Sequence, residues 1–294
     1  MTQLLKVLVT AKNGQVGYCL TERLKTRADV QLFSFDRTEL DITNKQQVEK
    51  AFNETQPDII INAAAYTAVD EAENDIANAF AINETGPKYL ADMAVQFEAI
   101  LLHISTDYVF DGSKDSPYLE TDTPSPQSVY GKSKLAGEQG IISSDCKHVI
   151  LRTAWVFGEH GNNFVKTMLR LGAARDTLGV IGDQFGGPTY AGDIADALIA
   201  IMDNYQCEAQ NGIYHFSGAP QVSWYQFATS IFENAKHHDL VLKELTINEI
   251  PATAYPLPAP RPANSRLNCE KVETVFGIRP SNWQQALENI MAYK

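Results

Sequence analysis

The fold is decided by the stretch LKVLVTAKNGQVG at residues 5–17. Its first part, Leu5–Thr10, is a short run of apolar and β-branched residues, which predicts a buried strand. Gly14 and Gly17 follow this run and begin a segment whose apolar residues recur at spacings of four, the pattern of a helix that packs on a sheet. The stretch therefore predicts a strand, a tight glycine turn and a helix.

Apolar runs of the same kind recur along the first half of the chain, at Val30–Phe35, Ile59–Asn62, 100–105 and 149–152. Helix-compatible sequence separates them, including residues 44–55 and 83–97. This alternation predicts right-handed βαβ units and an α/β fold, a Rossmann-type doubly wound parallel sheet.

Beyond about residue 156 the alternation loosens, with glycine and proline clustered at residues 182–188 and a proline-rich segment at 251–262. We expect residues 1–155 to form an NAD(P)-binding Rossmann domain. Residues 156–294 are expected to form mainly a smaller C-terminal substrate-binding lobe, with later segments returning to the first domain.

The composition limits the class of protein. A chain of 294 residues with 44% apolar side chains is long enough for one large core with an appended lobe. A formal net charge of −12 argues against nucleic acid or an anionic membrane as a partner. The four cysteines lie far apart and without metal-ligand spacing, so we expect reduced thiols in a cytoplasmic protein and no metal site.

The glycine turn predicts a nicotinamide cofactor. A glycine there lets the backbone approach a pyrophosphate, and the helix N-terminus supplies free N–H groups. Asp36 ends the second apolar run, 19 residues beyond Gly17, where a carboxylate binds the adenosine ribose of NAD. Arg37 follows at once and is suited to the 2′-phosphate of NADP, so the residues leave NADH and NADPH both open.

Three residues predict carbonyl reduction. Tyr130 and Lys134 are four apart at the start of a helical segment, and so share one helix face. A nearby ammonium favours the phenolate, so we expect Lys134 to lower the pKa of Tyr130 toward neutrality. Thr106 ends the fourth apolar run, at the sheet edge where ligands bind, and its hydroxyl is placed to polarise a substrate carbonyl.

Blocks of sequence distributed over the whole chain resemble the dTDP-4-dehydrorhamnose reductase family of the extended short-chain dehydrogenases/reductases. The matching blocks are Gly14-Gln15-Val16-Gly17, residues 62–70 (NAAAYTAVD), 105–110 (STDYVF), 130–138 (YGKSKLAGE), 152–156 (RTAWV), 161–164 (GNNF), 183–189 (DQFGGPT) and 261–267 (RPANSRL).

The resemblance implies a role for each matching residue. It makes Thr106, Tyr130 and Lys134 catalytic and places Asp107 and Trp155 with Thr106 against the substrate. Cofactor contacts are implied for Gly14, Gln15, Val16, Asp36, Asp41, Ile42, Ala65, Tyr66, Thr67, Tyr130 and Lys134. Arg261 and Arg266 offer positive charge for the substrate's pyrophosphate, with helix capping or a surface salt bridge as the competing interpretation.

Two departures from the family pattern limit what is carried over. Ala11 stands where many relatives have the first glycine of the turn, and because alanine disfavours positive φ we expect ordinary dihedral angles there. Cys19 and Gly192 fall near positions where some relatives carry carboxylates for a metal-linked dimer, so neither that metal nor that dimer is carried over, and a homodimer stays open.

The expected activity is NAD(P)H-dependent reduction of a dTDP-4-keto-6-deoxysugar to dTDP-L-rhamnose, for cell-surface polysaccharide such as lipopolysaccharide. One alternative is another nucleotide-sugar 4-ketoreductase, an epimerase or a dehydratase. Tyr108 after Asp107 argues against the dehydratase, because those enzymes typically have glutamate at that position. A non-catalytic regulatory subunit on this fold is the other alternative, and such a protein has no need of Thr106, Tyr130 and Lys134 together.

Overall fold

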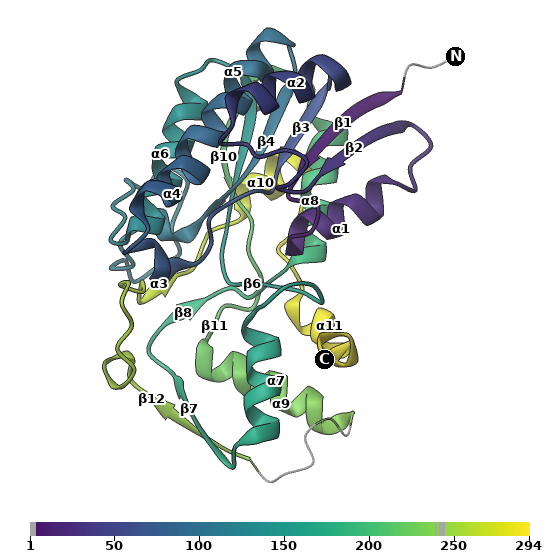
Figure 1. Cartoon of the computed structure of the whole chain (residues 1–294). Coiled ribbons are helices and arrows are strands. Elements are labelled where there is room, and N and C mark those ends of the chain that lie inside the picture. Colours follow the sequence, from purple (N-terminus) through teal and green to yellow (C-terminus); the bar gives the residue numbers. More distant parts are fainter. Residues whose placement is uncertain (1–3, 239, 241–244) are drawn as a thin grey trace.

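The computed structural model describes residues 4–238, 240 and 245–294, and its upper layer is a six-stranded sheet (Figure 1). The strands lie in the order β10-β5-β4-β3-β1-β2, and every neighbouring pair is parallel. Their bounds are β1 Leu5–Thr10, β2 Val30–Phe35, β3 Ile59–Asn62, β4 Ile100–Thr106, β5 Lys147–Thr153 and β10 Gly212–His215. The predicted α/β fold is confirmed.

The strand order creates a switch point between β1 and β3, because β2 lies on one side of β1 and β3 lies on the other. In an open parallel sheet, a switch point leaves a crevice at the carboxyl ends of the strands, and ligands bind there. Thr10, Asn62 and Thr106 are the last residues of β1, β3 and β4, so all three lie at this edge.

Helices cover both faces of the sheet (Figure 1). On one face, α1 and α8 pack over Val7, Val9 and neighbouring residues. On the other face, α2 and α5 pack over Leu8 and Ile60, and α6 crosses beside them. The helices associated with this layer are α1 Gln15–Leu24, α2 Lys45–Thr55, α3 Val69–Ala72, α4 Ile76–Phe80, the π-helical turn η1 Ala81–Thr85, α5 Gly86–Gln96, η2 Asp107–Val109, α6 Val129–Ile142, α8 Ala191–Asn204, η3 Glu208–Gln210 and α10 Glu270–Phe276.

A smaller layer lies below the sheet and has its own core around Phe157, Phe227 and Trp283 (Figure 1). It is built from later parts of the chain, whereas α8, β10 and α10 pack with the upper sheet. Its elements are β6 Val156–Phe157, α7 Phe164–Ala174, β7 Thr177–Ile181, β8 Phe185–Gly186, β9 Thr189–Tyr190, β11 Val222–Ser223, α9 Trp224–His237, β12 Thr246–Ile250, η4 Ala252–Ala254, β13 Asn264–Ser265, α11 Trp283–Glu288 and η5 Ile290–Tyr293.

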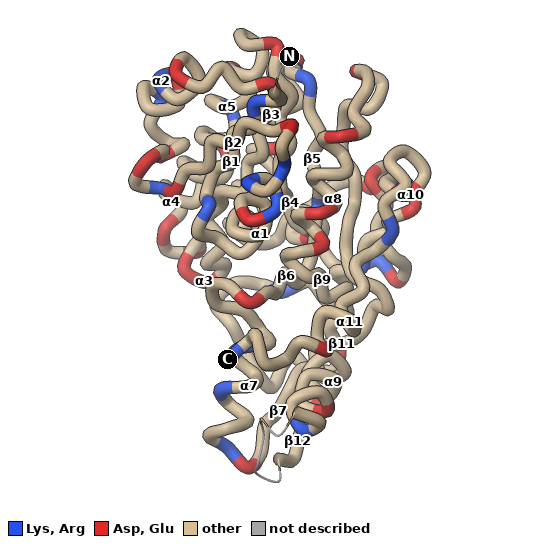
Figure 2. The backbone as a smooth tube through the Cα atoms, turned by 90° about the vertical axis from the view of Figure 1, so that its right-hand side faces the viewer, with Lys and Arg blue, Asp and Glu red and all other residues tan. Residues whose placement is uncertain are grey.

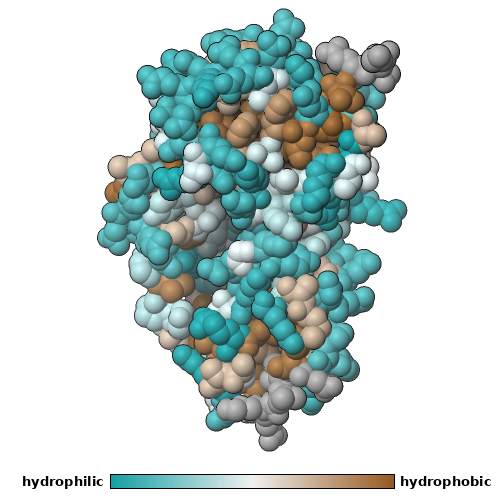
Figure 3. Space-filling view, turned by 45° about the vertical axis from the view of Figure 1, so that its right-hand side comes forward, coloured by the Kyte–Doolittle hydropathy of each residue, from teal (hydrophilic) through white to brown (hydrophobic). Residues whose placement is uncertain are grey.

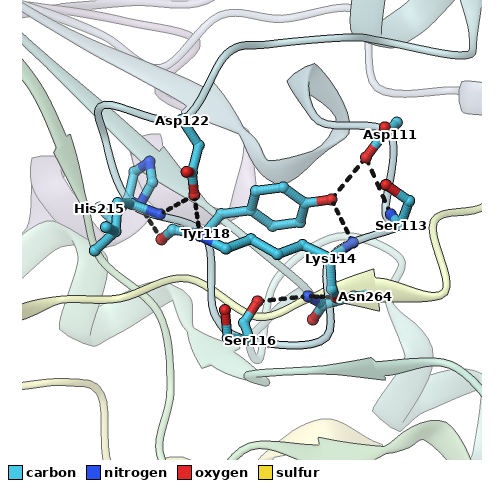
Figure 4. Close-up of polar contacts among 9 residues, drawn as sticks. Asp111, Ser113, Lys114, Ser116, Tyr118, Asp122, His215 and Asn264 are labelled. Atoms are coloured by element: carbon cyan, nitrogen blue, oxygen red, sulfur yellow. Dashed lines mark hydrogen bonds and ion pairs between the residues drawn. The ribbon is translucent and has the colours of Figure 1, made fainter.

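The long connection between β4 and α6 is tied to distant parts of the chain (Figure 4). The Tyr118 hydroxyl donates to Asp111 Oδ1 over 2.7 Å, and the ring of His215, at the end of β10, bonds the Tyr118 carbonyl over 3.1 Å. Asn264 Nδ2 donates to the Lys114 carbonyl over 2.6 Å. The contacts from His215 and Asn264 fix the middle of this connection against β10 and β13.

The surface carries charges of both signs, interspersed over the described residues (Figure 2). The face in Figure 3 is mostly hydrophilic, with hydrophobic side chains gathered in its upper part and near its lower end. Within the described part of the chain, no helix combines the length and apolarity needed to cross a bilayer.

Candidate active site

The glycine turn leaves the N-terminus of α1 open. Gly14 is the N-cap residue and provides no side-chain hydrogen bond to the helix, so the first N–H groups of α1 stay available to an anion. A Cβ on Gly17 would lie 2.0 Å from the Ala11 carbonyl oxygen, which shows how closely the helix packs against the turn. Backbone donors and close packing fit a dinucleotide pyrophosphate at this position.

Ala11 corrects one expectation. Its φ is 55°, so it adopts the left-handed conformation that the sequence analysis expected it to avoid. The Gly14 N–H donates to the Ala11 carbonyl over 2.8 Å and closes the turn. The turn geometry therefore overrides the preference of alanine, at a cost of about 1–2 kcal/mol.

Asp36 and Arg37 lie together beyond β2. Asp36 Oδ1 accepts from the N–H and the hydroxyl of Thr38, and its Oδ2 accepts from Asn13 over 3.2 Å. The Thr38 hydroxyl, more than any other contact, lowers the pKa of Asp36, so the group is a carboxylate acceptor at neutral pH. Arg37 is exposed beside it.

The segment after β3, where cofactor contacts are predicted, is held by Asn83, a residue that the sequence pattern did not single out. Asn83, fully buried in η1, accepts from the Tyr66 N–H over 2.8 Å and donates to the Tyr66 carbonyl over 3.1 Å. Its amide also lies 3.0 Å from Ser133 Oγ of α6. The π-helical turn puts Asn83 in this position, and hydrophobic periodicity in the sequence does not reveal such a turn.

Two more predicted cofactor residues, Asp41 and Ile42, lie between β2 and α2. Asp41 Oδ1 accepts from both the N–H and the hydroxyl of Thr43, over 2.9 and 2.7 Å. Ile42 is buried against Gly86, where a Cβ would lie 2.6 Å from its side chain. Asp41 thus shapes the loop, and Ile42 packs it onto α5.

Tyr130 and Thr106 meet at the sheet edge. Ser128 caps α6 by accepting from the Gly131 N–H over 3.1 Å, which places Tyr130 in the first turn of the helix. Thr106 is the last residue of β4, and its hydroxyl lies close enough to Tyr130 to lower the pKa of that phenol, against the larger effect of burial. The structure thus brings the predicted proton donor and the predicted polarising hydroxyl together.

Lys134 lies one turn further along α6 and is turned toward the sheet. Its Nζ donates to the Ile104 carbonyl over 2.7 Å and lies 3.3 Å from His103 Nε2. Burial raises the pKa of Tyr130 to about 12 and lowers the pKa of Lys134 to about 8. The expected fall of the Tyr130 pKa is wrong for this structure, because loss of hydration outweighs any attraction by Lys134.

A buried ion pair anchors the next turn of α6. Arg152 of β5 binds both carboxylate oxygens of Glu138, over 2.9 and 2.6 Å, and the Ser105 hydroxyl donates to Glu138 over 2.5 Å. Both charged side chains are 1% exposed. Tyr130, Lys134 and Glu138 therefore form one stripe of α6 that faces the sheet, because they are spaced four apart.

A cavity of about 570 Å³ reaches this part of the molecule at Tyr108, whereas Thr106, Tyr130 and Lys134 are not among the residues that line it. Tyr108 lines it and packs edge-on against Tyr130, with ring centroids 5.4 Å apart. Its wall is aromatic and cationic and comes from both layers. The lining includes Tyr108, Trp155, Phe164, Arg170, Arg175, Gln184, Trp224, Tyr255, Arg261 and Ser265.

The predicted substrate residues lie in different places. Trp155 lines the cavity and stacks on Trp224, with ring centroids 3.5 Å apart. Arg261 also lines it, in an ion pair with Asp70 over 2.7 Å. Arg266 is held elsewhere, because its guanidinium donates to Asn264 Oδ1 and to a loop carbonyl.

Asp107 is buried between Thr106 and the cavity wall. Its Oδ1 accepts from the Thr106 hydroxyl over 3.1 Å, and its other oxygen has no hydrogen-bond partner among the described residues. Burial raises its pKa to about 6, although the hydrogen bond from Thr106 acts in the opposite direction. The sequence placed Asp107 at the site, but its unusual proton affinity follows only from burial.

Comparisons with known proteins identify the family of this chain. The family model described as the RmlD substrate binding domain matches residues 5–294. A dTDP-4-dehydrorhamnose reductase of Aggregatibacter actinomycetemcomitans is 48% identical, over 98% of this chain and 99% of its own.

Two solved structures are similar over nearly the whole chain. A dTDP-4-dehydrorhamnose reductase of Clostridium acetobutylicum has a TM-score of 0.90 at 39% identity and covers 98% of each chain. The enzyme of Bacillus anthracis, in complex with NADP, has a TM-score of 0.90 at 35% identity and covers 99% of this chain and 100% of its own.

Proposed function

The chain belongs to the family of the RmlD substrate binding domain, and from that membership we propose that it reduces dTDP-4-dehydro-β-L-rhamnose to dTDP-L-rhamnose. This is an NAD(P)H-dependent reduction and the last step in making the activated sugar. The observation that carries the proposal is the placement of Thr106, Tyr130 and Lys134 beside a cavity lined by aromatic and cationic side chains.

Each catalytic side chain has a separate task. The glycine turn would hold the pyrophosphate of a nicotinamide dinucleotide, and that cofactor would supply the hydride. Tyr130 gives its phenolic proton to the carbonyl oxygen, and its raised pKa keeps the phenol protonated until charge develops on that oxygen. Thr106 donates a hydrogen bond to the same oxygen, and the charge of Lys134 stabilises the phenolate that remains.

Substrate binding is proposed for the cavity. The indole of Trp155, supported by Trp224, offers a flat apolar face to the deoxysugar ring. Arg261, with Arg170 and Arg175, supplies positive charge for the pyrophosphate. In this scheme residues 1–155 hold the cofactor and residues 156–294 mainly hold the substrate, in a cytoplasmic enzyme.

The test supplies dTDP-4-dehydrorhamnose with NADH or NADPH and follows the loss of nicotinamide absorbance. We expect stoichiometric oxidation, and Tyr130→Phe is expected to lower kcat by about 10²–10⁴-fold. Tyr214→Phe is the matched control, because Tyr214 is also buried but its hydroxyl bonds the Gln210 carbonyl, away from the site. Turnover without net oxidation would indicate an epimerase, and full activity in Tyr130→Phe would remove the proposed proton donor.

A further inference from the structure

Three buried polar side chains form a row across the sheet and end at Lys134. The parallel register pairs Asn62 of β3 with His103 of β4, and Thr10 of β1 follows the pair formed by Val9 and Ile61. The three side chains therefore share one face, which is the face covered by α6. Asn62 and His103 are fully buried, so each hydrogen atom in the row must have a partner.

The orientation of the Asn62 amide follows from its neighbours. The Thr10 hydroxyl oxygen accepts from the N–H groups of Ala63 and Ala64, over 3.1 and 3.2 Å, so its own proton is free to point to Asn62 Oδ1, 2.7 Å away. The Ala64 N–H also lies 3.2 Å from Asn62 Oδ1. Asn62 therefore presents its oxygen to Thr10 and its NH₂ group to His103.

That orientation selects the tautomer of His103. Asn62 Nδ2 lies 3.0 Å from His103 Nδ1, which must accept and hence carries no proton. Burial, reinforced by the charge of Lys134, holds the pKa of His103 well below its usual value, so the ring is neutral. Its single proton is then on Nε2, the nitrogen that faces Lys134 Nζ at 3.3 Å.

An Nε2–H donor suits one protonation state of Lys134 better than the other. A neutral amine accepts from it and still donates to the Ile104 carbonyl, 2.7 Å away. An ammonium has only donors to offer, so two donors face each other. The opposite tautomer only moves this conflict to Asn62, because neutral imidazole has a single accepting nitrogen.

Other charged groups near Lys134 do not cancel this effect. Glu138, on the same helix, favours the ammonium, but Arg152 of β5 binds both of its oxygens. Asp107 of η2 acts on Tyr130, which raises the pKa of that phenol further. Lys88 of α5 is paired with Asp92 at the surface.

We propose that His103 is a positioning residue. Asn62 holds it with its Nε2–H toward Lys134, which makes the ammonium form of Lys134 less favourable. Lys134 therefore loses a proton within the working pH range. Burial by itself lowers the pKa of Lys134 to about 8, and the donor that His103 presents would add to that effect. The proposal concerns the catalytic lysine and, in its link to turnover, rests on the proposed function.

Nuclear magnetic resonance tests the arrangement without any assay of activity. In protein labelled with ¹⁵N-histidine, long-range proton–nitrogen correlations identify the protonated ring nitrogen, and His103→Gln assigns the signal. We expect Nε2 to carry the proton in the wild type. A proton on Nδ1 would overturn the proposal.

Titration of ¹³Cε-labelled lysine then measures the effect on Lys134, whose signal is assigned with Lys134→Met. Asn62→Asp replaces the donor with an acceptor and reverses the tautomer, and His103→Gln gives the ammonium an amide oxygen. Each is expected to raise the titration midpoint of Lys134 by about one pH unit or more. His148→Gln is the control, because His148 is a buried histidine of β5 that bonds the Cys146 carbonyl. An unchanged midpoint in whichever variants fold would overturn the proposal.

Kinetics complete the test. The reduction needs a protonated Lys134, so kcat is expected to fall on the alkaline side, and this limb should move to higher pH with the midpoint in both variants. A purely structural role would lower kcat without moving the limb, and that result would overturn the link to turnover. If the wild type does not reduce dTDP-4-dehydrorhamnose, the proposed function fails while both resonance experiments still decide the role of His103.

Discussion

The buried row formed by Thr10, Asn62, His103 and Lys134 differs from the substrate cavity in the origin of its contacts. Three members of the row come from neighbouring parallel strands, and the fourth comes from the helix packed on them. The cavity wall comes mainly from α7, β7, α9 and residues 250–265, with Tyr108 of η2, and these segments are brought together only where the two layers meet. Sheet register therefore determines the row, and the meeting of two layers determines the cavity.

This difference predicts two kinds of response to substitution. In the sheet layer, polar groups are shut away from water, so loss of one partner costs stability. In the cavity, charged groups face solvent and wait for a ligand, so loss of one should cost affinity and leave the fold unchanged.

The largest expected effect is on stability, at the ion pair beside the row. Glu138→Gln leaves the buried guanidinium of Arg152 without a counter-charge and should reduce the free energy of unfolding by about 3–5 kcal/mol. Urea denaturation followed by circular dichroism measures it. The control is Glu54→Gln, at an exposed pair 3.8 Å apart, where a change of about 0.5 kcal/mol at most is expected. Equal losses in the two variants would contradict the comparison.

Asp107 lies at the junction of the two regions, and its burial predicts that the free energy of unfolding depends on pH. Burial raises its pKa to about 6, so the protonated form stabilises the fold at low pH, and this contribution is lost as pH rises from about 4 through about 6. Asp107→Asn mimics the protonated form. Relative to the wild type, it should gain roughly 3 kcal/mol between about pH 4 and about pH 7. A difference in stability that does not vary with pH would show that Asp107 titrates normally.

Substitution of an arginine that lines the cavity should have the opposite effect to Glu138→Gln, lowering affinity and not stability. Arg170→Ala is expected to raise KM for the dTDP-sugar about tenfold, because a charge-assisted contact to the pyrophosphate is lost, with little change in kcat or in unfolding free energy. Steady-state kinetics measures both constants. Arg279→Ala serves as control, since Arg279 is 88% exposed and does not line this cavity. A fall in stability as large as that of Glu138→Gln would show that the cavity is built like the row.

The smallest effect is expected at the glycine turn. Ala11→Gly relieves the positive φ of 55° and should stabilise the protein by about 0.5–1 kcal/mol, seen as a higher Tm. Ala173→Gly, at an exposed position in α7 with ordinary helical geometry, should instead lose about 1 kcal/mol. A lower Tm in Ala11→Gly would mean that the alanine methyl group is needed in the turn.

Local pattern predicted most of the sheet layer. The runs at Leu5–Thr10, Val30–Phe35 and Ile59–Asn62 match their strands residue for residue, because a short run rich in apolar and β-branched residues is a strong strand signal. The expected helix at residues 83–97 begins within a π-helical turn, Ala81–Thr85, in which Asn83 binds the segment after β3. That turn depends on a contact with a distant segment, which hydrophobic periodicity does not encode.

By itself, the sequence determined the parallel sheet, the glycine turn and the four-residue spacing of Tyr130 and Lys134, because each depends on neighbours in the chain. Only the tertiary structure decided which groups those residues meet. It set the left-handed conformation of Ala11, the row that leads from Thr10 to Lys134 and the arginines of the cavity. Strand register and packing between layers join residues far apart in sequence, and burial there sets proton affinities that no local pattern reveals.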